Sequence, residues 1–225
     1  MNLTQAQKDM AMKIDQTLLK PFVTEQEVAD FVEKSLPYDF HTLMVYSSQV
    51  PFCKPFLTGS VTNLGCVVGF PSGQVSIEAK CFEAEQAIRQ GADEIDYVIN
   101  ITKLKSGDTA YIQKEMQEIT KLCHDAGKLC KVITETCYLT QAEKEFLCRA
   151  AAEVRPDFLK TSTGFGSGGA TVADVQLYAK ESPVLVKASG GIRDAKAAGE
   201  MIKAGASRIG TSAGIQIVEA VYTEY

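Results

Sequence analysis

The sequence alternates eight times between a short apolar run and a longer amphipathic segment, and this alternation limits the fold more than any other feature. The apolar runs lie at residues 12–19, 41–46, 64–70, 94–100, 129–135, 157–161, 183–189 and 207–212. Strands that alternate with helices form a parallel sheet, and eight strand–helix units close into a barrel. We therefore predict an α/β fold, a single-domain TIM (β/α)8 barrel over residues 1–225. An open doubly wound sheet is also compatible with the alternation, and only the count of eight favours closure.

The segments between the apolar runs have the three- and four-residue spacing of amphipathic helices. Between residues 108 and 128 the apolar side chains recur at 112, 116, 119 and 123, which lie on one helical face. Asp108 is a suitable N-cap for this helix, and Gly127 is expected to end it. The segments at 76–91 and 193–205 behave alike and also end in glycine.

Charged side chains share one face of the expected strands, because consecutive strand residues point to opposite faces. The charged face carries Lys13, Asp15, Glu94, Asp96, Asn100, Lys131, Glu135 and Lys160. The opposite face carries Ile14, Leu18, Ile95, Tyr97, Ile99, Val132, Leu159, Val184 and Val186. The apolar face must pack under the helices, so the charged face is expected to line the barrel lumen. Buried charges are costly unless they pair. They indicate either a structural ion-pair network or a reaction centre at the carboxyl ends of the strands.

Lys160 and Lys187 lie near the ends of the sixth and seventh apolar runs. Successive strands of this fold are neighbours about 4.8 Å apart. Two ammonium groups about 5 Å apart repel by roughly 3 kcal/mol at an effective dielectric constant near 20, which could lower one pKa by about two units. Partial desolvation acts in the same direction. One lysine is therefore expected to be uncharged near neutral pH and able to form a Schiff base, while the other keeps its proton beside a carboxylate such as Asp96 or Asp15. The pattern does not say which lysine is which.

Glycine-rich turns follow the last three runs. Residues 164–169 match GxGxxG formally, but a nicotinamide site would need an acidic residue at the end of the next strand, where Lys187 lies instead. The turns at 189–193 and 210–214 fit a phosphate better, because glycine lets backbone N–H groups approach an oxyanion and barrels often bind phosphate with these loops. For either turn alone, a tight loop without a ligand is an equally good explanation.

The composition excludes several classes of partner. The chain has a net charge of −5 and a pI of about 5.2, without a lysine- or arginine-rich block, so neither nucleic acid nor an anionic membrane is expected. No apolar run approaches the roughly 20 residues that span a bilayer, and the amino terminus lacks the features of a secretory signal. Seven cysteines without a CxxC pair indicate free thiols in a reducing cytoplasm. His41 and His124 lack zinc-ligand spacing, and a structural role is expected for both, with His124 at a helix terminus.

The motifs resemble those of a known family, the class I (Schiff-base) 2-deoxyribose-5-phosphate aldolases, which are TIM barrels. The similar segments are KIDQTLL, VVGFPSG, GADEIDYVIN, LKSGD, KVITET, FLKTSTGFGSGGAT, VKASGGIR and RIGTSAG, and they run in the family's order over nearly the whole chain. The resemblance implies a lyase that reversibly cleaves 2-deoxy-D-ribose 5-phosphate into D-glyceraldehyde 3-phosphate and acetaldehyde, without a metal or other cofactor.

The resemblance also implies roles for individual residues. Lys160 matches the Schiff-base lysine, Lys187 the second lysine that lowers its pKa, and Asp96 the carboxylate of the proton relay. Asp15 matches a further lumen acid in the substrate site. The positions that match the family's phosphate grip, or lie close to it, are Gly164, Gly190, Gly191, Gly210 and Ser212. Family members are commonly homodimers or homotetramers that act in nucleoside breakdown.

Three positions depart from the family's pattern. Gln16 replaces the histidine of the usual IDHTLL and alternates away from Asp15, so it is expected to change the helix-facing side and not the chemistry. Met44 and Ser47 replace the cysteine and proline of the usual VCVNP, which leaves the preference for the acceptor and donor aldehydes undetermined. The tail residue Tyr225 is assigned no role.

Two other functions stay open from the sequence. One is a related Schiff-base aldolase that acts on another phosphosugar, which the changed second run allows. The other is a barrel that binds sugar phosphate without catalysis, although the presence of both lysines and Asp96 argues against it.

Overall fold

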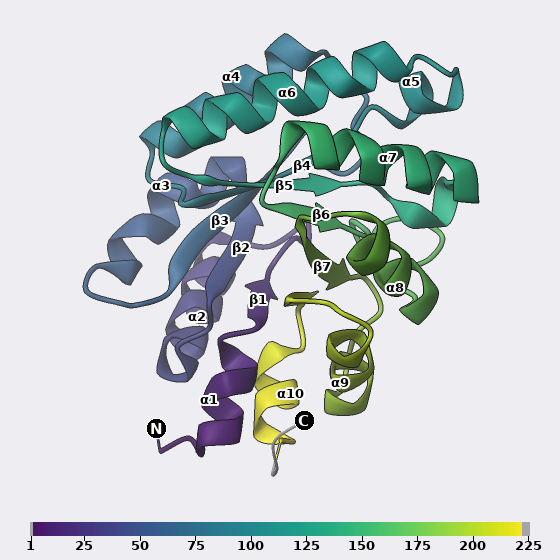
Figure 1. Ribbon diagram of the computed structural model, residues 1–225. Helices are drawn as coiled ribbons and strands as arrows, with labels where there is room; N and C mark the ends of the chain where they lie inside the picture. Colours follow the sequence, from purple (N-terminus) through teal and green to yellow (C-terminus); the bar gives the residue numbers. More distant parts are fainter. Residues whose placement is uncertain (1, 222–225) are drawn as a thin grey trace.

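Eight parallel strands form a closed barrel in the computed structural model, which describes residues 2–221 (Figure 1). The strands are β1 (Ile14–Thr17), β2 (Thr42–Tyr46), β3 (Asn63–Val68), β4 (Glu94–Val98), β5 (Leu129–Ile133), β6 (Phe158–Lys160), β7 (Leu185–Ser189) and β8 (Arg208–Thr211). Each lies within one of the eight apolar runs or begins one residue before it. Because β1 pairs with both β2 and β8, the sheet is closed. The predicted barrel is confirmed, and the open doubly wound sheet is wrong.

Helices surround the barrel and connect its strands (Figure 1). They are α1 (Gln5–Ala11), α2 (Glu25–Ser35), α3 (Val50–Cys53), α4 (Ile77–Arg89), α5 (Ile101–Lys105), α6 (Thr109–Asp125), α7 (Gln141–Val154), α8 (Val172–Glu181), α9 (Ala195–Lys203) and α10 (Gly214–Glu219). Short 3-10 turns, η1 (Leu36–Tyr38), η2 (Ser47–Gln49), η3 (Lys54–Leu57) and η4 (Thr136–Tyr138), complete the connections. The expected ends of α6 are confirmed: the Asp108 side chain accepts a bond from the Tyr111 N–H, and Gly127 follows in the left-handed region.

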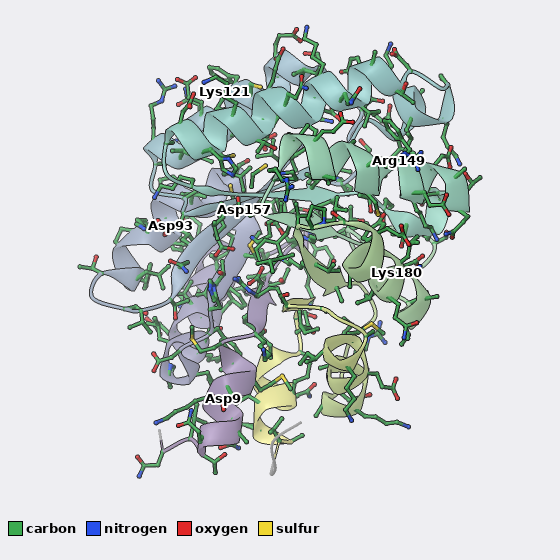
Figure 2. All side chains as sticks on the ribbon, in the orientation of Figure 1. Asp9, Asp93, Lys121, Arg149, Asp157 and Lys180 are labelled. Atoms are coloured by element: carbon green, nitrogen blue, oxygen red, sulfur yellow. The ribbon has the colours of Figure 1, made fainter. Side chains whose placement is uncertain are left out.

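The two faces of the sheet differ as the alternation predicts. The outward side chains Ile14, Ile95, Tyr97, Val132, Leu159 and Val186 are buried in the core beneath the helices. The inward face carries charged groups that are equally buried, among them Asp15, Asp96 and Lys131. Lys121 on α6, by contrast, points to solvent (Figure 2).

The prediction fails at the ends of three runs. Lys13 is exposed, because β1 begins only at Ile14. Asn100 lies beyond the end of β4 and caps α5 by accepting a bond from the Lys103 N–H. Glu135 follows β5 with a backbone φ of 55°, which takes its side chain out of the strand alternation. Alternation holds only while the backbone stays extended, so it does not extend to these positions.

Three further expectations can be compared with the structure. All seven cysteines are free thiols, as predicted. His124 lies in the last turn of α6, where its Nε2 is 3.0 Å from Asp157 Oδ2. Among residues 2–221, no helix is both long and apolar enough to cross a bilayer. Tyr225 lies outside the described residues.

Candidate active site

Strands β6 and β7 place Lys160 and Lys187 side by side, since the two residues are partners in the strand register. Both ammonium nitrogens donate to the same oxygen, Asp96 Oδ2, at 2.8 Å from Lys160 and 2.7 Å from Lys187. Lys187 and Asp96 are completely buried, whereas Lys160 retains 4% of its accessible surface. The structure therefore brings together the three residues that the sequence assigned to catalysis.

The backbone fixes the direction of Lys160. Leu159 packs outward in the core, so its neighbour Lys160 must point into the lumen. The ladder continues past the end of β6, with the Thr134 N–H donating to the Lys160 carbonyl at 3.0 Å and the Thr161 N–H donating to the Lys187 carbonyl at 3.1 Å. Lys160 thus lies on rigid backbone at the carboxyl end of its strand.

Burial and the neighbouring charges lower the pKa of Lys160 to about 8. Burial is the largest cause, the Asp96 carboxylate opposes it, and the nearby Lys187 ammonium lowers the pKa further. The sequence argument started from the repulsion between the two lysines; in the structure desolvation is the larger effect. An appreciable fraction of Lys160 is uncharged near neutral pH.

Two basic residues that the sequence analysis did not assign to the site complete its electrostatics. Lys131 Nζ lies 2.5 Å from both Asp96 Oδ1 and Glu94 Oε2. Arg208 donates from its NH1 to Asp15 Oδ1 at 2.7 Å. Lys131 lies on the charged strand face that the sequence predicts. Arg208 is the first residue of β8, two positions before Gly210, so strand alternation puts both residues on the same face. This spacing was the one sequence signal for Arg208.

The lumen carboxylates are held ionised by these cations. Although burial opposes ionisation, Lys131, Lys160 and Lys187 hold the pKa of Asp96 well below its usual range. Burial also opposes ionisation of Asp15 and Glu94, but the surrounding lysines and Arg208 lower both pKa values. The Asp96 and Glu94 carboxylates in turn outweigh burial and raise the pKa of Lys131. Ion pairing therefore outweighs burial at these three carboxylates and at Lys131, whereas burial prevails at Lys160.

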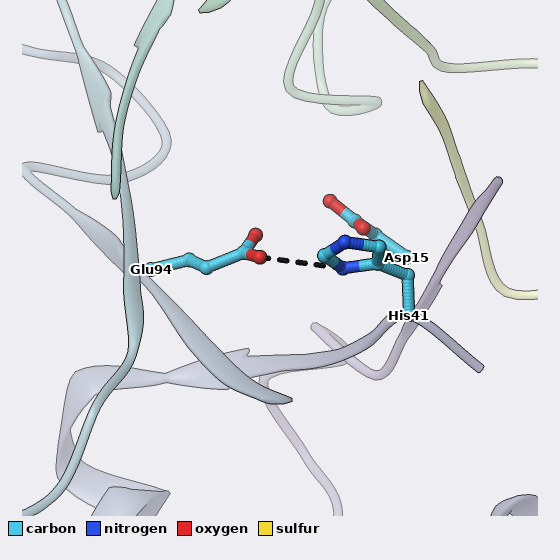
Figure 3. Close-up of side chains that lie close together, drawn as sticks. All are labelled: Asp15, His41 and Glu94. Atoms are coloured by element: carbon cyan, nitrogen blue, oxygen red, sulfur yellow. Dashed lines mark ion pairs between the residues drawn. The ribbon is translucent and has the colours of Figure 1, made fainter. Parts of the chain in front are cut away.

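Asp15, His41 and Glu94 converge below the lysines, with potential ligand atoms within 4.8 Å of one another (Figure 3). These atoms already have partners. Arg208 NH2 lies 3.0 Å from His41 Nε2, and because a guanidinium only donates, this nitrogen is the acceptor. Arg208 and Lys131 also neutralise the two carboxylates. The group is thus better suited to an arginine than to a metal ion.

A cavity of about 360 Å³ opens above Lys160 at the carboxyl ends of the strands. The predicted phosphate-binding positions Gly164, Gly190, Gly191, Gly210 and Ser212 all line it. Gly190 and Gly191 have φ values of 84° and 80°, which disfavour any side chain. At Gly210 a Cβ atom would come within 2.9 Å of Lys187 Cε. Lys20 and Arg193, which the sequence analysis did not assign, also line the cavity and add positive charge.

Asp15 differs from the other predicted substrate-site residues. It is completely buried below the cavity, and its carboxylate contacts Lys187 and Arg208. Asp15 is thus not among the residues that line the cavity, and its role in substrate binding stays a prediction; β1 pairs it with Thr42 and Gly210.

The three departures from the family's pattern have partners elsewhere in the barrel. Gln16 points to the helix side as predicted, where its Oε1 accepts a bond from the Gly214 N–H at 2.9 Å. Met44 is buried against Leu19 and Val67 in a small apolar cluster. Ser47 donates to Glu83 on α4 at 2.6 Å.

Comparison with known proteins gives a consistent result. The model of the family described as DeoC/LacD family aldolase matches residues 10–222. The deoxyribose-phosphate aldolase of Bacteroides thetaiotaomicron is 47% identical over 215 residues, which cover 95% of this chain and 90% of that protein. The enzyme of the same name from Thermococcus kodakarensis is 45% identical over 221 residues, 96% of this chain and 99% of that one. The solved tetrameric deoxyribose phosphate aldolase of Aeropyrum pernix has a TM-score of 0.89 and 30% identity, with 96% of this chain and 92% of that chain covered.

Proposed function

The chain belongs to the DeoC/LacD family of aldolases, and from this premise we propose that it is a lyase that reversibly cleaves 2-deoxy-D-ribose 5-phosphate into D-glyceraldehyde 3-phosphate and acetaldehyde. The names of its relatives support this substrate. The observation that carries the chemistry is the single oxygen, Asp96 Oδ2, that Lys160 and Lys187 share beside the cavity.

Lys160 is the nucleophile in this proposal. Its uncharged amine adds to the C1 aldehyde of the open-chain sugar, and loss of water gives a protonated imine. The imine accepts the electron pair of the C2–C3 bond while the C3 hydroxyl loses its proton, which releases D-glyceraldehyde 3-phosphate and leaves an enamine. Protonation of the enamine at C2 and hydrolysis then release acetaldehyde and the free amine.

Asp96 and Lys187 move the protons that these steps require. Asp96 contacts both lysines, so it can accept a proton from one and return it through bound water. Lys187 also contacts Asp15 and supplies the positive charge that keeps Lys160 reactive. The other end of the substrate is placed by the glycine turns: Gly190, Gly191 and Gly210 offer backbone N–H groups to the phosphate, with Ser212 and Gly164 beside them.

We further infer a single catalytic domain that works without a metal or other cofactor, as a cytoplasmic enzyme of deoxyribose phosphate metabolism. The seven free thiols support a reducing compartment. A homo-oligomer is supported by the tetrameric relative from Aeropyrum pernix.

Trapping with borohydride tests the proposal. Incubation with acetaldehyde and borohydride is expected to add a stable ethyl group to Lys160, located by peptide mass spectrometry. Cleavage of 2-deoxy-D-ribose 5-phosphate is compared with that of other pentose and hexose phosphates. An unmodified Lys160, or faster cleavage of another phosphosugar, would overturn the assignment.

A further inference from the structure

Seven charged side chains are buried together in the lumen, and we call them the lumen network. They are Asp15, Glu94, Asp96, Lys131, Lys160, Lys187 and Arg208. Three are carboxylates and four are basic, so the network carries one positive charge more than it can neutralise internally. With Lys160 uncharged, the sum is zero.

We propose that Lys131, Glu94 and Arg208, below the cavity, are positioning residues whose fixed charges make Lys160 the one surplus base of the lumen network. The proposal rests on the function proposed above, since it explains how the reactive amine stays uncharged. Lys131 holds Asp96 through Oδ1, the oxygen that Lys160 and Lys187 leave free. Its effect on Lys160 therefore passes through charge and through the orientation of Asp96.

Burial makes this balance of charge decisive. Six members of the network retain at most 4% of their accessible surface, and Arg208 retains 6%. Water and dissolved ions cannot screen charges at such positions, so an unbalanced charge is unfavourable and a titratable member gives it up. Lys160 is the member that borders the cavity, where a proton can leave.

Three further charged side chains near the cavity are not members of the lumen network. Lys20 and Arg193 line the cavity but are exposed, so water screens them. Glu135, directly after β5, is buried, and its carboxylate accepts bonds from the N–H and hydroxyl of Thr163.

Strands β2 and β3 contain no charged residue. Tyr46 at the end of β2 donates its hydroxyl to the Leu19 carbonyl, and burial raises its pKa. His41 accepts from Arg208 at Nε2, which places its proton on Nδ1, near Glu94 and Thr42.

Two substitutions of opposite sign test the proposal. Lys131→Met removes a positive charge, and Glu94→Gln removes a negative charge with almost no change in shape. The first is expected to raise the pH midpoint of Lys160 titration by about one unit or more, and the second to lower it by a similar amount. The double variant keeps the balance, so its midpoint is expected near that of the unchanged protein.

The midpoint is read without any turnover. Acetic anhydride modifies only uncharged amines, so the labelling of Lys160 across pH, measured by peptide mass spectrometry, reports its titration even if the protein cleaves no sugar. Cleavage of 2-deoxy-D-ribose 5-phosphate is measured separately and tests the proposed function alone. Lys80→Met, which removes an equally buried lysine on the outer side of the sheet, is the matched control and is expected to leave the midpoint unchanged.

Opposite shifts in the two single variants, restored in the double variant, would establish the lumen network as the origin of the reactive amine. Shifts in the same direction, or a midpoint that none of the variants moves, would overturn it. If Lys131→Met does not fold, Glu94→Gln and the double variant still test the proposal. A merely structural role of Glu94 predicts that Glu94→Gln does not lower the pH midpoint of Lys160 titration.

Discussion

Two regions of the molecule bury a lysine against a carboxylate, and they differ in the balance between basic and acidic groups. Outside the barrel, Lys80 on α4 lies 2.6 Å from Glu115 on α6 and also donates to the Val98 carbonyl at 2.7 Å. The second Glu115 oxygen accepts the Asn100 N–H at 2.9 Å. Both side chains are completely buried, with one charge of each sign. Inside the barrel, four basic side chains share three carboxylates, and one of them, Lys160, borders the cavity at the carboxyl ends of the strands.

This difference teaches that a low pKa does not by itself mark a nucleophile. Burial lowers the pKa of Lys80 as it does that of Lys160, with the partner carboxylate opposing in each case. Burial also raises the pKa of Glu115, so that pair can neutralise itself by moving one proton. Asp96 is instead held ionised by three lysines and cannot take the proton permanently. Surplus charge together with access distinguishes the reactive lysine from the structural one.

Replacing the reactive lysine gives the largest expected effect. Lys160→Ala is expected to lower kcat for 2-deoxy-D-ribose 5-phosphate cleavage by about 10⁴-fold or more, because it removes the amine that forms the Schiff base. Steady-state kinetics measure it, and thermal denaturation serves as the folding control. Retained activity would remove Lys160 from the mechanism.

Replacing the structural lysine is expected to act on stability instead. Lys80→Met leaves Glu115 buried without its cation, so the free energy of unfolding should fall by about 3 kcal/mol, measured in urea. The kcat of the folded fraction should stay near that of the unchanged protein. Replacing both partners, Lys80→Met with Glu115→Leu, should restore much of the loss. A large fall in kcat without loss of stability would break the comparison.

Changing the charge beside Lys160 is expected to move its pH dependence. The reactive form is uncharged and the pKa of Lys160 is lowered to about 8, so the cleavage rate should rise with pH and level off above that value. Lys187→Leu removes a repelling charge and should move the midpoint upward by about one pH unit, which lowers activity at pH 7. An unchanged pH profile would show that Lys187 has no electrostatic role.

An exposed lysine gives the smallest expected effect. Lys121 on α6 pairs with Asp125, but its side chain is 74% exposed and water screens the pair (Figure 2). Lys121→Met should therefore leave both the urea midpoint and kcat unchanged within error. A loss comparable to that of Lys80→Met would mean that burial does not separate the two kinds of lysine.

The sequence predicts the barrel and its charged lumen well, because both follow from local periodicity. The eight apolar runs mark the strands, and the alternation around Asp96 and Lys160 marks the inner face. It does not predict that two lysines share one Asp96 oxygen, since that depends on how side chains from β4, β6 and β7 meet. Arg208 and Lys131 were missed as members of the site for the same reason.

The buried Lys80–Glu115 pair was not predicted, although the sequence carried a signal for it. Lys80 falls on the buried face of α4 with Ile77 and Ala84, and Glu115 lies between Ile112 and Met116 on the buried part of α6. A charge on the apolar face of each of two helices indicates a buried pair. Their contact in space follows from the packing of α4 on α6, which helical periodicity does not determine.

The titration of Lys160 in the unaltered protein tests the account most directly. Acetaldehyde and borohydride are applied across a pH series, and the modified lysines are quantified by peptide mapping. We predict that ethylation concentrates on Lys160 with a midpoint at about pH 8, while the buried Lys80 stays unmodified. A midpoint near 10.4, as for an ordinary lysine, would contradict the claim that the lumen keeps one amine free.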